Sequence, residues 1–159
     1  MGWNSSAAKI DAYELMLQQL QGLCEMEQDK IATLANSSAL LASVIPDTVF
    51  AGYYLFDGNE LILGPFQGSV SCTRIQLGKG VCGESAAIQK SVIVDNVKEY
   101  HNYISCDAAA QSEIVVPMVK AGRLVGVLDL DSQLVASYDE VDRKYLEQMV
   151  DHLLATIAW

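Results

Sequence analysis

The sequence predicts an α+β fold, in which helices cover one face of a central antiparallel sheet of about six strands. Apolar residues recur at helical spacing near both ends of the chain, and between them the period changes to two, as in half-buried strands. Turn dipeptides such as Asp57-Gly58 join these strands, which favours hairpins and antiparallel pairing. The other face of the sheet is then available for a ligand pocket.

Residues from about 7 to 42 carry an apolar stripe that predicts two helices. We expect the break between them near Gly22 to Glu27. Pro46 is expected to end the second helix or the turn after it, since proline cannot continue a helix.

A further helix is expected to close the chain. Ser137 and Glu140 match a capping box, which places its start at Ser137. Apolar residues follow at helical spacing. The helices at both ends carry more apolar residues than one sheet face needs, so we expect a homodimer.

Six strands and one short helix are expected between the terminal helices. A segment of about 14 residues, KEYHNYISCDAAAQ, has no clear period and is long enough to be an active-site or binding loop. The expected strands are residues 48 to 56, 60 to 63, 70 to 76, 91 to 95, 113 to 120 and 123 to 131, and the expected short helix is residues 84 to 90.

A chain of 159 residues is expected to form one domain. Residues 1 to 45 would hold the N-terminal helices, residues 47 to 136 the sheet and active-site loops, and residues 137 to 159 the C-terminal helix. No stretch approaches the roughly 20 apolar residues that span a membrane. The first 20 residues do not resemble a signal peptide. We therefore expect a cytoplasmic location and no membrane partner.

The net charge is −10, from 20 acidic and 10 basic side chains. This field repels phosphate backbones, so nucleic acid is not an expected partner. The four cysteines, Cys24, Cys72, Cys82 and Cys106, lie far apart and lack the two-residue spacing of zinc or dithiol motifs. We therefore expect no metal, and the thiols are either buried packing residues or reactive groups.

The positions of the cysteines separate these alternatives in part. Cys106 lies in the aperiodic segment, where a reactive thiol is expected. Cys72 lies in an expected strand, and it can meet Cys106 only if its side chain faces the pocket and not the core. Cys24 lies on an expected helix and is interpreted as a packing residue.

Three carboxylates stand beside apolar strand sequence. Glu113 precedes one strand, and Asp129 and Asp131 alternate on another, so both point to one face. For Asp129 and Asp131, a solvated edge with two exposed acids is one interpretation. If all three instead face a pocket, a cation is needed to offset the cost of burying them.

Five sequence blocks resemble a known family. The overall layout resembles a GAF domain. Between about residues 47 and 150, the blocks resemble the signature of the free methionine-(R)-sulfoxide reductases. They are GPFQG (64 to 68), GKGVCG (78 to 83), ISCD (104 to 107), SEIVVP (112 to 117) and GVLDLDS (126 to 132).

The resemblance implies a thiol enzyme that reduces free methionine (R)-sulfoxide to methionine. It implies that Cys106 attacks the sulfoxide sulfur and becomes a sulfenic acid, which a second thiol converts to a disulfide. By position, Cys72 is the implied principal resolving residue and Cys82 a second participant. Thioredoxin or a similar dithiol is the expected electron donor, and no bound cofactor is expected.

The same resemblance suggests how the substrate is held. A sulfoxide needs an acid with a raised pKa to protonate its oxygen, and Glu113 suits this role. The carboxylates among Glu113, Asp129 and Asp131 that do not protonate the oxygen would pair with the ammonium group, which is a neutral amide when the residue is within a protein. The sequence leaves open which acid has which role. Phe50 and Tyr54 are implied as the apolar wall for the methyl thioether end.

The sequence departs from the family pattern at two positions. Phe50 replaces the usual tryptophan, and Tyr103 replaces the usual histidine near the cysteine block. The glycine-rich stretch from Gly78 to Gly83 is either a carboxylate-binding site at a helix start or a plain turn.

Two other functions remain open at this point. A GAF sensor would bind a small ligand and report through its terminal helices. A redox-sensing module would switch conformation through its thiols without turnover. Ligand binding alone gives no reason for three thiols beside acidic residues.

Overall fold

The computed structural model describes residues 2 to 159 and contains four α-helices, six β-strands and one short 3₁₀ helix among them. The helices are α1 (Ser6–Met26), α2 (Lys30–Val44), α3 (Gly80–Ile88), α4 (Glu140–Thr156) and the 3₁₀ helix η1 (Val97–Glu99). The strands are β1 (Thr48–Phe56), β2 (Glu60–Gly68), β3 (Arg74–Gln76), β4 (Val92–Val94), β5 (Ser112–Lys120) and β6 (Arg123–Ser132).

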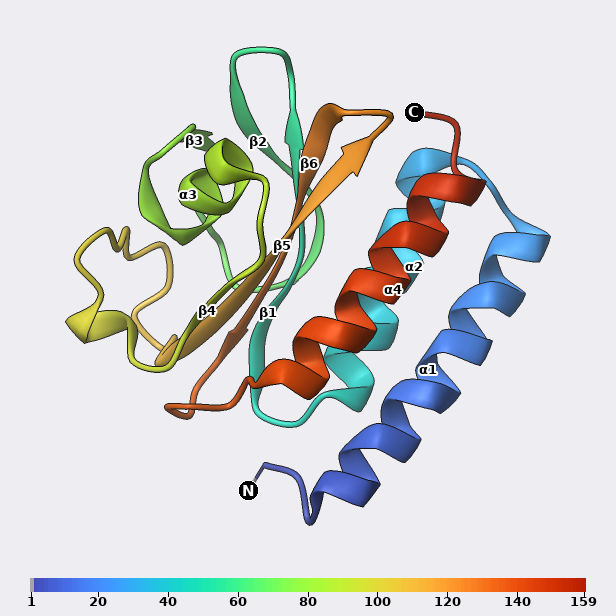
Figure 1. Cartoon of the computed structure of the whole chain (residues 1–159), viewed down its shortest axis with the longest axis horizontal. Coiled ribbons are helices and arrows are strands. Elements are labelled where there is room, and N and C mark those ends of the chain that lie inside the picture. Colours follow the sequence, from blue (N-terminus) through green and yellow to red (C-terminus); the bar gives the residue numbers. More distant parts are fainter. Residues whose placement is uncertain (1) are drawn as a thin grey trace.

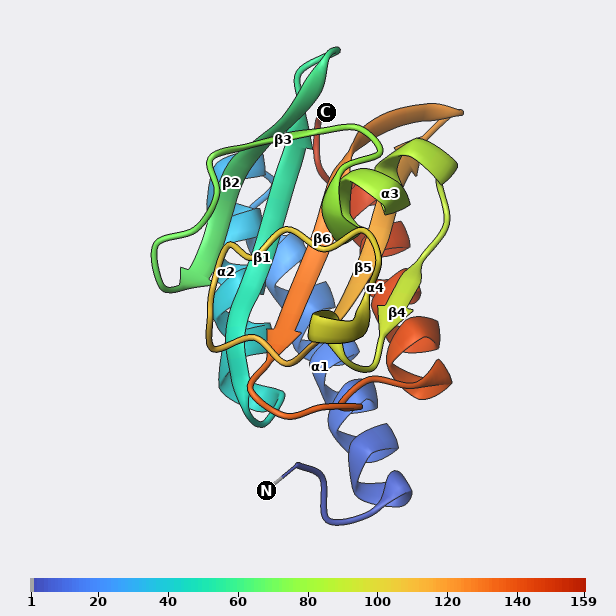
Figure 2. The ribbon, with the colours of Figure 1, turned by 90° about the vertical axis from the view of Figure 1, so that its left-hand side faces the viewer.

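The strands form one antiparallel sheet in the order β3-β2-β1-β6-β5-β4. Helices α1, α2 and α4 lie on one side of this sheet, whereas α3 and the loop between β4 and β5 lie on the other (Figure 1). Viewed from that second side, the loop passes across the face of β1 and β6 (Figure 2). The expected α+β class, with helices on one face and the pocket side on the other, is confirmed.

Alternation along the strands divides the buried side chains between two cores. Tyr53, Ile114 and Leu128 point toward the helices and pack with the apolar stripes of α1, α2 and α4. Tyr54 and Val115 point to the opposite side and pack against α3. The same alternation places the acidic residues of β5 and β6 on the α3 side. This second face is the one that carries the candidate site.

The start of the last helix differs from the prediction. Asp139, not Ser137, is the N-cap residue, and its side chain accepts the backbone N–H of Val141. Asp142 completes the capping box, so Glu140 is not its acidic member. The Ser137 hydroxyl instead donates to Ser132 and Leu134 in the preceding loop. The sequence contains two overlapping capping signals, one at Ser137 and one at Asp139. Only the signal at Asp139 forms a capping box.

Two predicted strands have different bounds in the structure. Strand β2 continues through Gly64 and Pro65 to Gly68, with an irregular register against β1. Strand β3 begins only at Arg74, so Cys72 lies in an irregular segment and not in a strand. The expectation that Cys72 alternates within a strand was therefore wrong.

The remaining bounds differ by a few residues. The break between α1 and α2 falls just after the expected position, because Asp29 caps α2. Helix α3 begins at Gly80, four residues before the expected start, and so includes Cys82. Among residues 2 to 159, the structure has no helix that is both long and apolar enough to cross a membrane.

Candidate active site

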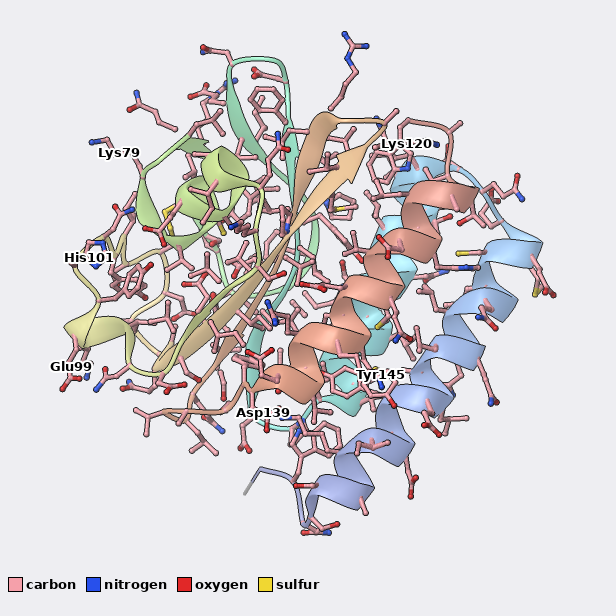
Figure 3. All side chains as sticks on the ribbon, viewed as in Figure 1. Lys79, Glu99, His101, Lys120, Asp139 and Tyr145 are labelled. Carbon is pink, nitrogen blue, oxygen red and sulfur yellow. A yellow bond between two sulfur atoms is a disulfide. The ribbon has the colours of Figure 1, made fainter. Side chains whose placement is uncertain are left out.

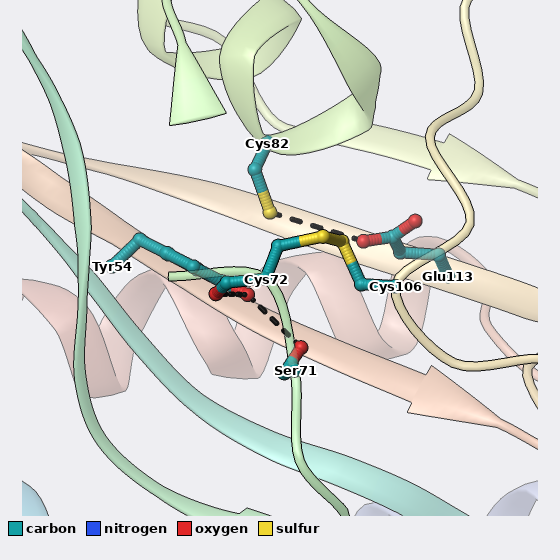
Figure 4. Close-up of a disulfide and its surroundings, with 6 residues drawn as sticks. All are labelled: Tyr54, Ser71, Cys72, Cys82, Cys106 and Glu113. Carbon is teal, nitrogen blue, oxygen red and sulfur yellow. Dashed lines mark hydrogen bonds between the residues drawn. A yellow bond between two sulfur atoms is a disulfide. The ribbon is translucent and has the colours of Figure 1, made fainter. Parts of the chain in front are cut away.

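Cys72 and Cys106 form a disulfide on the α3 side of the sheet (Figure 4). Cys72 comes from the irregular segment before β3, and Cys106 from the loop between β4 and β5, 34 residues further along the chain. Their Cα atoms are 5.2 Å apart, within the usual range for a disulfide. The structure therefore brings together the two thiols that were expected to react with each other.

The hydroxyl of Tyr54 holds the Cys72 segment in place. It donates to the backbone carbonyl of Cys72 at 3.0 Å and lies 3.1 Å from the Ser71 hydroxyl (Figure 4). Tyr54 is buried in β1, so this anchor is fixed to the sheet. Tyr54 was expected only as an apolar wall. The role of Ser71 was missed, because a serine in an aperiodic segment gives no sequence signal.

The loop that carries Cys106 is fastened to the start of α3. Asn102 accepts the N–H of Gly80 at 3.2 Å and donates to the carbonyl of Gly78 at 3.0 Å. The Tyr100 hydroxyl donates to Glu84 on the same helix. His101, labelled at the outer edge in Figure 3, is exposed and lies beside Glu84. Asn102 was not singled out from the sequence.

The glycine-rich stretch is already hydrogen-bonded within the protein. The N–H of Gly78 donates to the carbonyl of Gly83, and the N–H of Gly83 donates to the carbonyl of Lys79. Asn102 accepts the N–H of Gly80. These three amides are therefore not free to receive a substrate carboxylate while the loop is closed, and here the turn interpretation fits better.

The three carboxylates lie together on the pocket face. Glu113 in β5 is paired directly with Asp131 in β6, and Asp129 is two residues along the same face. Glu113 and Asp129 are 6% and 4% exposed. The interpretation of a solvated edge with two exposed acids is thus wrong for Asp129, and Asp131 is half-buried. No lysine, arginine or histidine among residues 2 to 159 forms a salt bridge with the trio.

Burial and mutual repulsion raise the pKa values of these acids. Burial raises the pKa of Glu113 well above its usual range, and the charges of Asp129 and Asp131 raise it further. Burial, followed by the charge of Asp129, likewise raises the pKa of Asp131. Burial also raises the pKa of Asp129, although contacts with Glu113 and Cys82 oppose that rise. Glu113 can therefore keep a proton at a pH where an ordinary glutamate has lost it.

Cys82 adds a third thiol to this face. It lies on α3, is 4% exposed, and its Sγ is 3.9 Å from Glu113 Oε2 (Figure 4). Burial, with the charges of Asp129 and Glu113, raises the pKa of this thiol well above its usual range. Cys24 is buried among the helices on the opposite side of the sheet. Its interpretation as a packing residue agrees with this position.

Aromatic residues extend the apolar part of the site. Phe50 stacks on Tyr54 and Phe66, with ring centroids 6.1 and 5.1 Å apart. Phe50 is buried on the pocket side but does not line the cavity in this closed form. Tyr103 does line it, and burial together with the charge of Glu113 raises its pKa to about 12. Its phenol is therefore a neutral group at physiological pH.

The cavity between these groups holds only about 20 Å³ of free space, which is room for about one water molecule. An apolar cavity that holds one benzene is about 150 Å³. The disulfide and the loop therefore close the site against an amino acid. The cavity is lined by Tyr54, Ser71, Ile75, Gly80, Val81, Cys82, Tyr103, Ile104, Cys106, Asp107, Glu113, Asp129 and Asp131.

The fold and the site define a class of protein. The sequence model of the GAF domain matches residues 32–158, and the chain belongs to the GAF domain family.

Comparison with individual proteins identifies the subgroup of GAF domains to which the chain belongs. The chain is 39% identical over 150 residues to free methionine-R-sulfoxide reductase of Escherichia coli, covering 94% of this chain and 91% of that protein. It is 44% identical over 155 residues to protein YtsP of Bacillus subtilis, covering 96% and 95%. A structure of free methionine-R-sulfoxide reductase from Neisseria meningitidis, in complex with its substrate, superposes with a TM-score of 0.91 at 38% identity, covering 98% and 94%. Within the GAF domains, this chain therefore belongs to the free methionine-R-sulfoxide reductase family.

Proposed function

We propose that this protein reduces free L-methionine (R)-sulfoxide to L-methionine. The observation that carries the proposal is the Cys72–Cys106 disulfide beside the buried carboxyl groups of Glu113 and Asp129 and the half-buried Asp131. The named relatives support the same reaction. A ligand sensor needs neither the paired thiols nor the acids with raised pKa values.

In the first step, the Cys106 sulfur attacks the sulfoxide sulfur. The sulfoxide oxygen is transferred to Cys106, so one thiol and one sulfoxide give one sulfenic acid and one methionine. Glu113 donates a proton to the sulfoxide oxygen, which makes the sulfur a better electrophile. Its raised pKa supports this role, because a proton donor must keep its proton near neutral pH.

In the second step, the Cys72 thiol condenses with the sulfenic acid, giving the disulfide and one water. The disulfide in the structure supports Cys72 as the principal resolving residue. Cys82 takes part as a second thiol. Because burial beside anions holds its pKa high, it is a slower nucleophile than an exposed thiol.

Asp129 and Asp131 receive the ammonium group of the substrate. The absence of a competing cation supports this assignment, since no cationic side chain of residues 2 to 159 forms a salt bridge with them. A methionine sulfoxide residue within a protein has a neutral amide in place of that ammonium. The site is therefore selective for the free amino acid, and Phe50 and Tyr54 supply the apolar wall for its methyl thioether end.

A dithiol protein such as thioredoxin returns the disulfide to two thiols by exchange. Val70 and Ile104 support a docking surface beside the disulfide. Each lies two residues from a disulfide cysteine, and their side chains are 92% and 41% exposed. This cycle requires a reducing compartment, in agreement with the expected cytoplasmic location. Exposed Leu15, Met26 and Ile31 on α1 and α2 support the expected homodimer.

Methionine formation from the separate R and S epimers, with a thioredoxin couple as donor, tests this function. The R epimer should be reduced and the S epimer should not, and Cys106→Ser should abolish turnover. Cys24→Ala is the matched control, because Cys24 lies on the other side of the sheet. Absence of turnover with the R epimer would exclude the proposed reaction.

A further inference from the structure

Cys82, Glu113 and Asp129 form a compact cluster of metal-ligating atoms within the candidate active site. One sulfur and two carboxylate oxygens all lie within 4.8 Å of one another, and all three residues are buried. They come from α3, β5 and β6, so three separate elements converge on this point. The spacing of these residues along the chain gives no metal motif, which is why none was expected from the sequence.

Asp129 has an oxygen without a partner. Its Oδ1 is fully buried and accepts no hydrogen bond from residues 2 to 159, and the residue is only 4% exposed. A buried acceptor left unpaired is destabilising, and more so when it is charged. No lysine, arginine or histidine of residues 2 to 159 forms a salt bridge with Asp129. The buried ammonium of Lys9 pairs instead with Asp139 and Asp142 at the start of α4. A positive ion would satisfy both the unpaired oxygen and the uncompensated charge.

We propose that Cys82, Glu113 and Asp129 form a divalent-cation site, with the chemistry that favours Zn²⁺, and that a bound ion inhibits the enzyme. Zinc accepts both thiolate and carboxylate ligands, at about 2.3 Å to sulfur and about 2.0 to 2.2 Å to oxygen. Ligand atoms around such an ion lie roughly 3 to 4 Å apart. The cluster needs only a small contraction to reach that geometry. Mg²⁺ and Ca²⁺ prefer oxygen ligands alone, so the Cys82 sulfur disfavours both.

The size of the cavity also fits an ion. Its free space of about 20 Å³ accommodates one particle the size of a water molecule, which is enough for a single ion. An amino acid does not fit until the loop opens. The site can therefore hold a cation in the closed form, in which Cys82 is still a free thiol and Cys72 and Cys106 are joined.

Inhibition is the expected consequence, and this part of the inference rests on the proposed function. The ion would occupy the place of the substrate ammonium at Asp129. It would also bind Glu113 in its charged form and so remove the proton that the reaction requires. Zinc would therefore compete with methionine sulfoxide, and the site would make the activity sensitive to free zinc.

A Cys72→Ser/Cys106→Ser double variant isolates the site, because Cys82 is then the remaining thiol of the cavity. Zn²⁺ binding measured by titration calorimetry should give one ion per chain. Co²⁺ used as a spectroscopic probe should give a thiolate-to-metal charge-transfer band. Both signals are read without any turnover, so failure of the proposed function would leave this measurement intact.

Adding Cys82→Ser or Asp129→Asn to the double variant should weaken Zn²⁺ binding by about 100-fold or more, since even outer-shell partners are worth about 10- to 100-fold. Adding Cys24→Ala should leave binding unchanged. Circular dichroism melting confirms that each variant is folded. Absence of saturable binding, or equal affinity after Cys82→Ser or Asp129→Asn, would overturn the site.

Inhibition of sulfoxide reduction by Zn²⁺ is tested by a separate measurement. Reduced wild type, freed from reductant, should convert the R epimer more slowly in a single turnover when Zn²⁺ is present. Raising the sulfoxide concentration should restore the rate, because the two compete. A Zn²⁺ effect that high substrate does not relieve would overturn competition at this site, whereas a protein that binds Zn²⁺ but never forms methionine would overturn only the proposed function.

Discussion

Glu113 owes its chemistry to its surroundings. Residue pairing across β5 and β6 sets it opposite Asp131, and alternation along β6 adds Asp129. Burial and these two negative charges together raise its pKa. An isolated glutamate on a surface would have lost its proton at neutral pH and would serve poorly as an acid. The three carboxyl groups therefore act as a unit.

Replacing Glu113 by glutamine keeps the side-chain size and removes the proton donor. We expect Glu113→Gln to lower kcat by about 100-fold or more, within the 10²- to 10⁴-fold range typical of general acid catalysis. Steady-state reduction of the R epimer measures this. Glu99→Gln is the control, since Glu99 lies at the outer edge of the molecule (Figure 3). Retention of more than half of the wild-type kcat would remove Glu113 from the proposed role.

The same substitution should change how stability depends on pH. The pKa of Glu113 is higher in the folded than in the unfolded protein, so the folded state binds more protons between these two values. Its favourable contribution is complete below the unfolded pKa and is lost as pH rises toward the folded pKa. Glu113→Gln should therefore raise the free energy of unfolding near neutral pH.

Urea unfolding of the oxidised proteins from about pH 4 to about pH 8 measures this difference. The stability gain of Glu113→Gln should be small at the acidic end, where the wild-type carboxyl is protonated, and should grow with pH. A gain that stays constant with pH would show that the glutamine packs better for reasons unrelated to charge.

At the scale of elements, the start of α3 holds the loop that carries Cys106. Asn102 bonds to Gly78 and Gly80 and so fixes the entry to this loop. Gly80 has a φ of 63°, and an added Cβ there would lie 3.2 Å from Ile104. A glycine at this position therefore permits both the backbone turn and the close packing of the loop.

Asn102→Ala removes these hydrogen bonds but none of the reacting groups. We expect kcat/KM to fall by about 10-fold, because small displacements of a reacting atom reduce the rate strongly. The free energy of unfolding should change by only about 1 kcal/mol, since Asn102 itself belongs to neither core. Asn59→Ala, in the turn between β1 and β2, is the matched control. Equal kinetic effects of the two substitutions would contradict a positioning role for Asn102.

The sequence predicts elements well where one local signal dominates. The alternation of β5 and β6 correctly placed Asp129 and Asp131 on one face, because the period of a strand leaves no other choice. The helix start near Ser137 was predicted wrongly because two capping signals overlap and burial around Asp142 decides between them. Cys72 was wrongly assigned to a strand. Pairing with β2, and not the local sequence pattern, determines where β3 begins.

The parts of the site that the sequence did not predict are those built from contacts between distant segments. Tyr54 reaches Ser71 and Cys72 across the sheet, and Asn102 reaches α3. A polar side chain in an aperiodic segment carries no periodic signal, so such partners become visible only in three dimensions. The cysteine roles came from the resemblance to a family and not from periodicity.

At the scale of the whole molecule, the disulfide joins the loop between β4 and β5 to the segment before β3 at the candidate site. In the oxidised form the loop closes the cavity to about 20 Å³, while the disulfide remains near exposed Val70. In the proposed cycle, a reductant would therefore approach a closed protein. We expect reduction to release Cys106 and let the loop open, so that substrate and reductant act in turn on different forms.

Val70 is suited to contact the protein that reduces the disulfide, because it is 92% exposed and two residues from Cys72. We expect Val70→Asp to raise the KM for thioredoxin by about 10-fold, since a charge disrupts an apolar contact. Activity with dithiothreitol should stay within about 2-fold of wild type. Val135→Asp, at another exposed valine, is the matched control. Equal losses with both reductants would assign Val70 a role in the fold and not in docking.

The central claim is that Cys106 reduces the R epimer and that Cys72 then closes the disulfide. A single turnover of fully reduced protein, without any added reductant, tests it most directly. The account predicts one methionine per chain from the R epimer, none from the S epimer, and a Cys72–Cys106 disulfide as the main product in a peptide map. No methionine from the R epimer, or a main disulfide that omits Cys106, would contradict it.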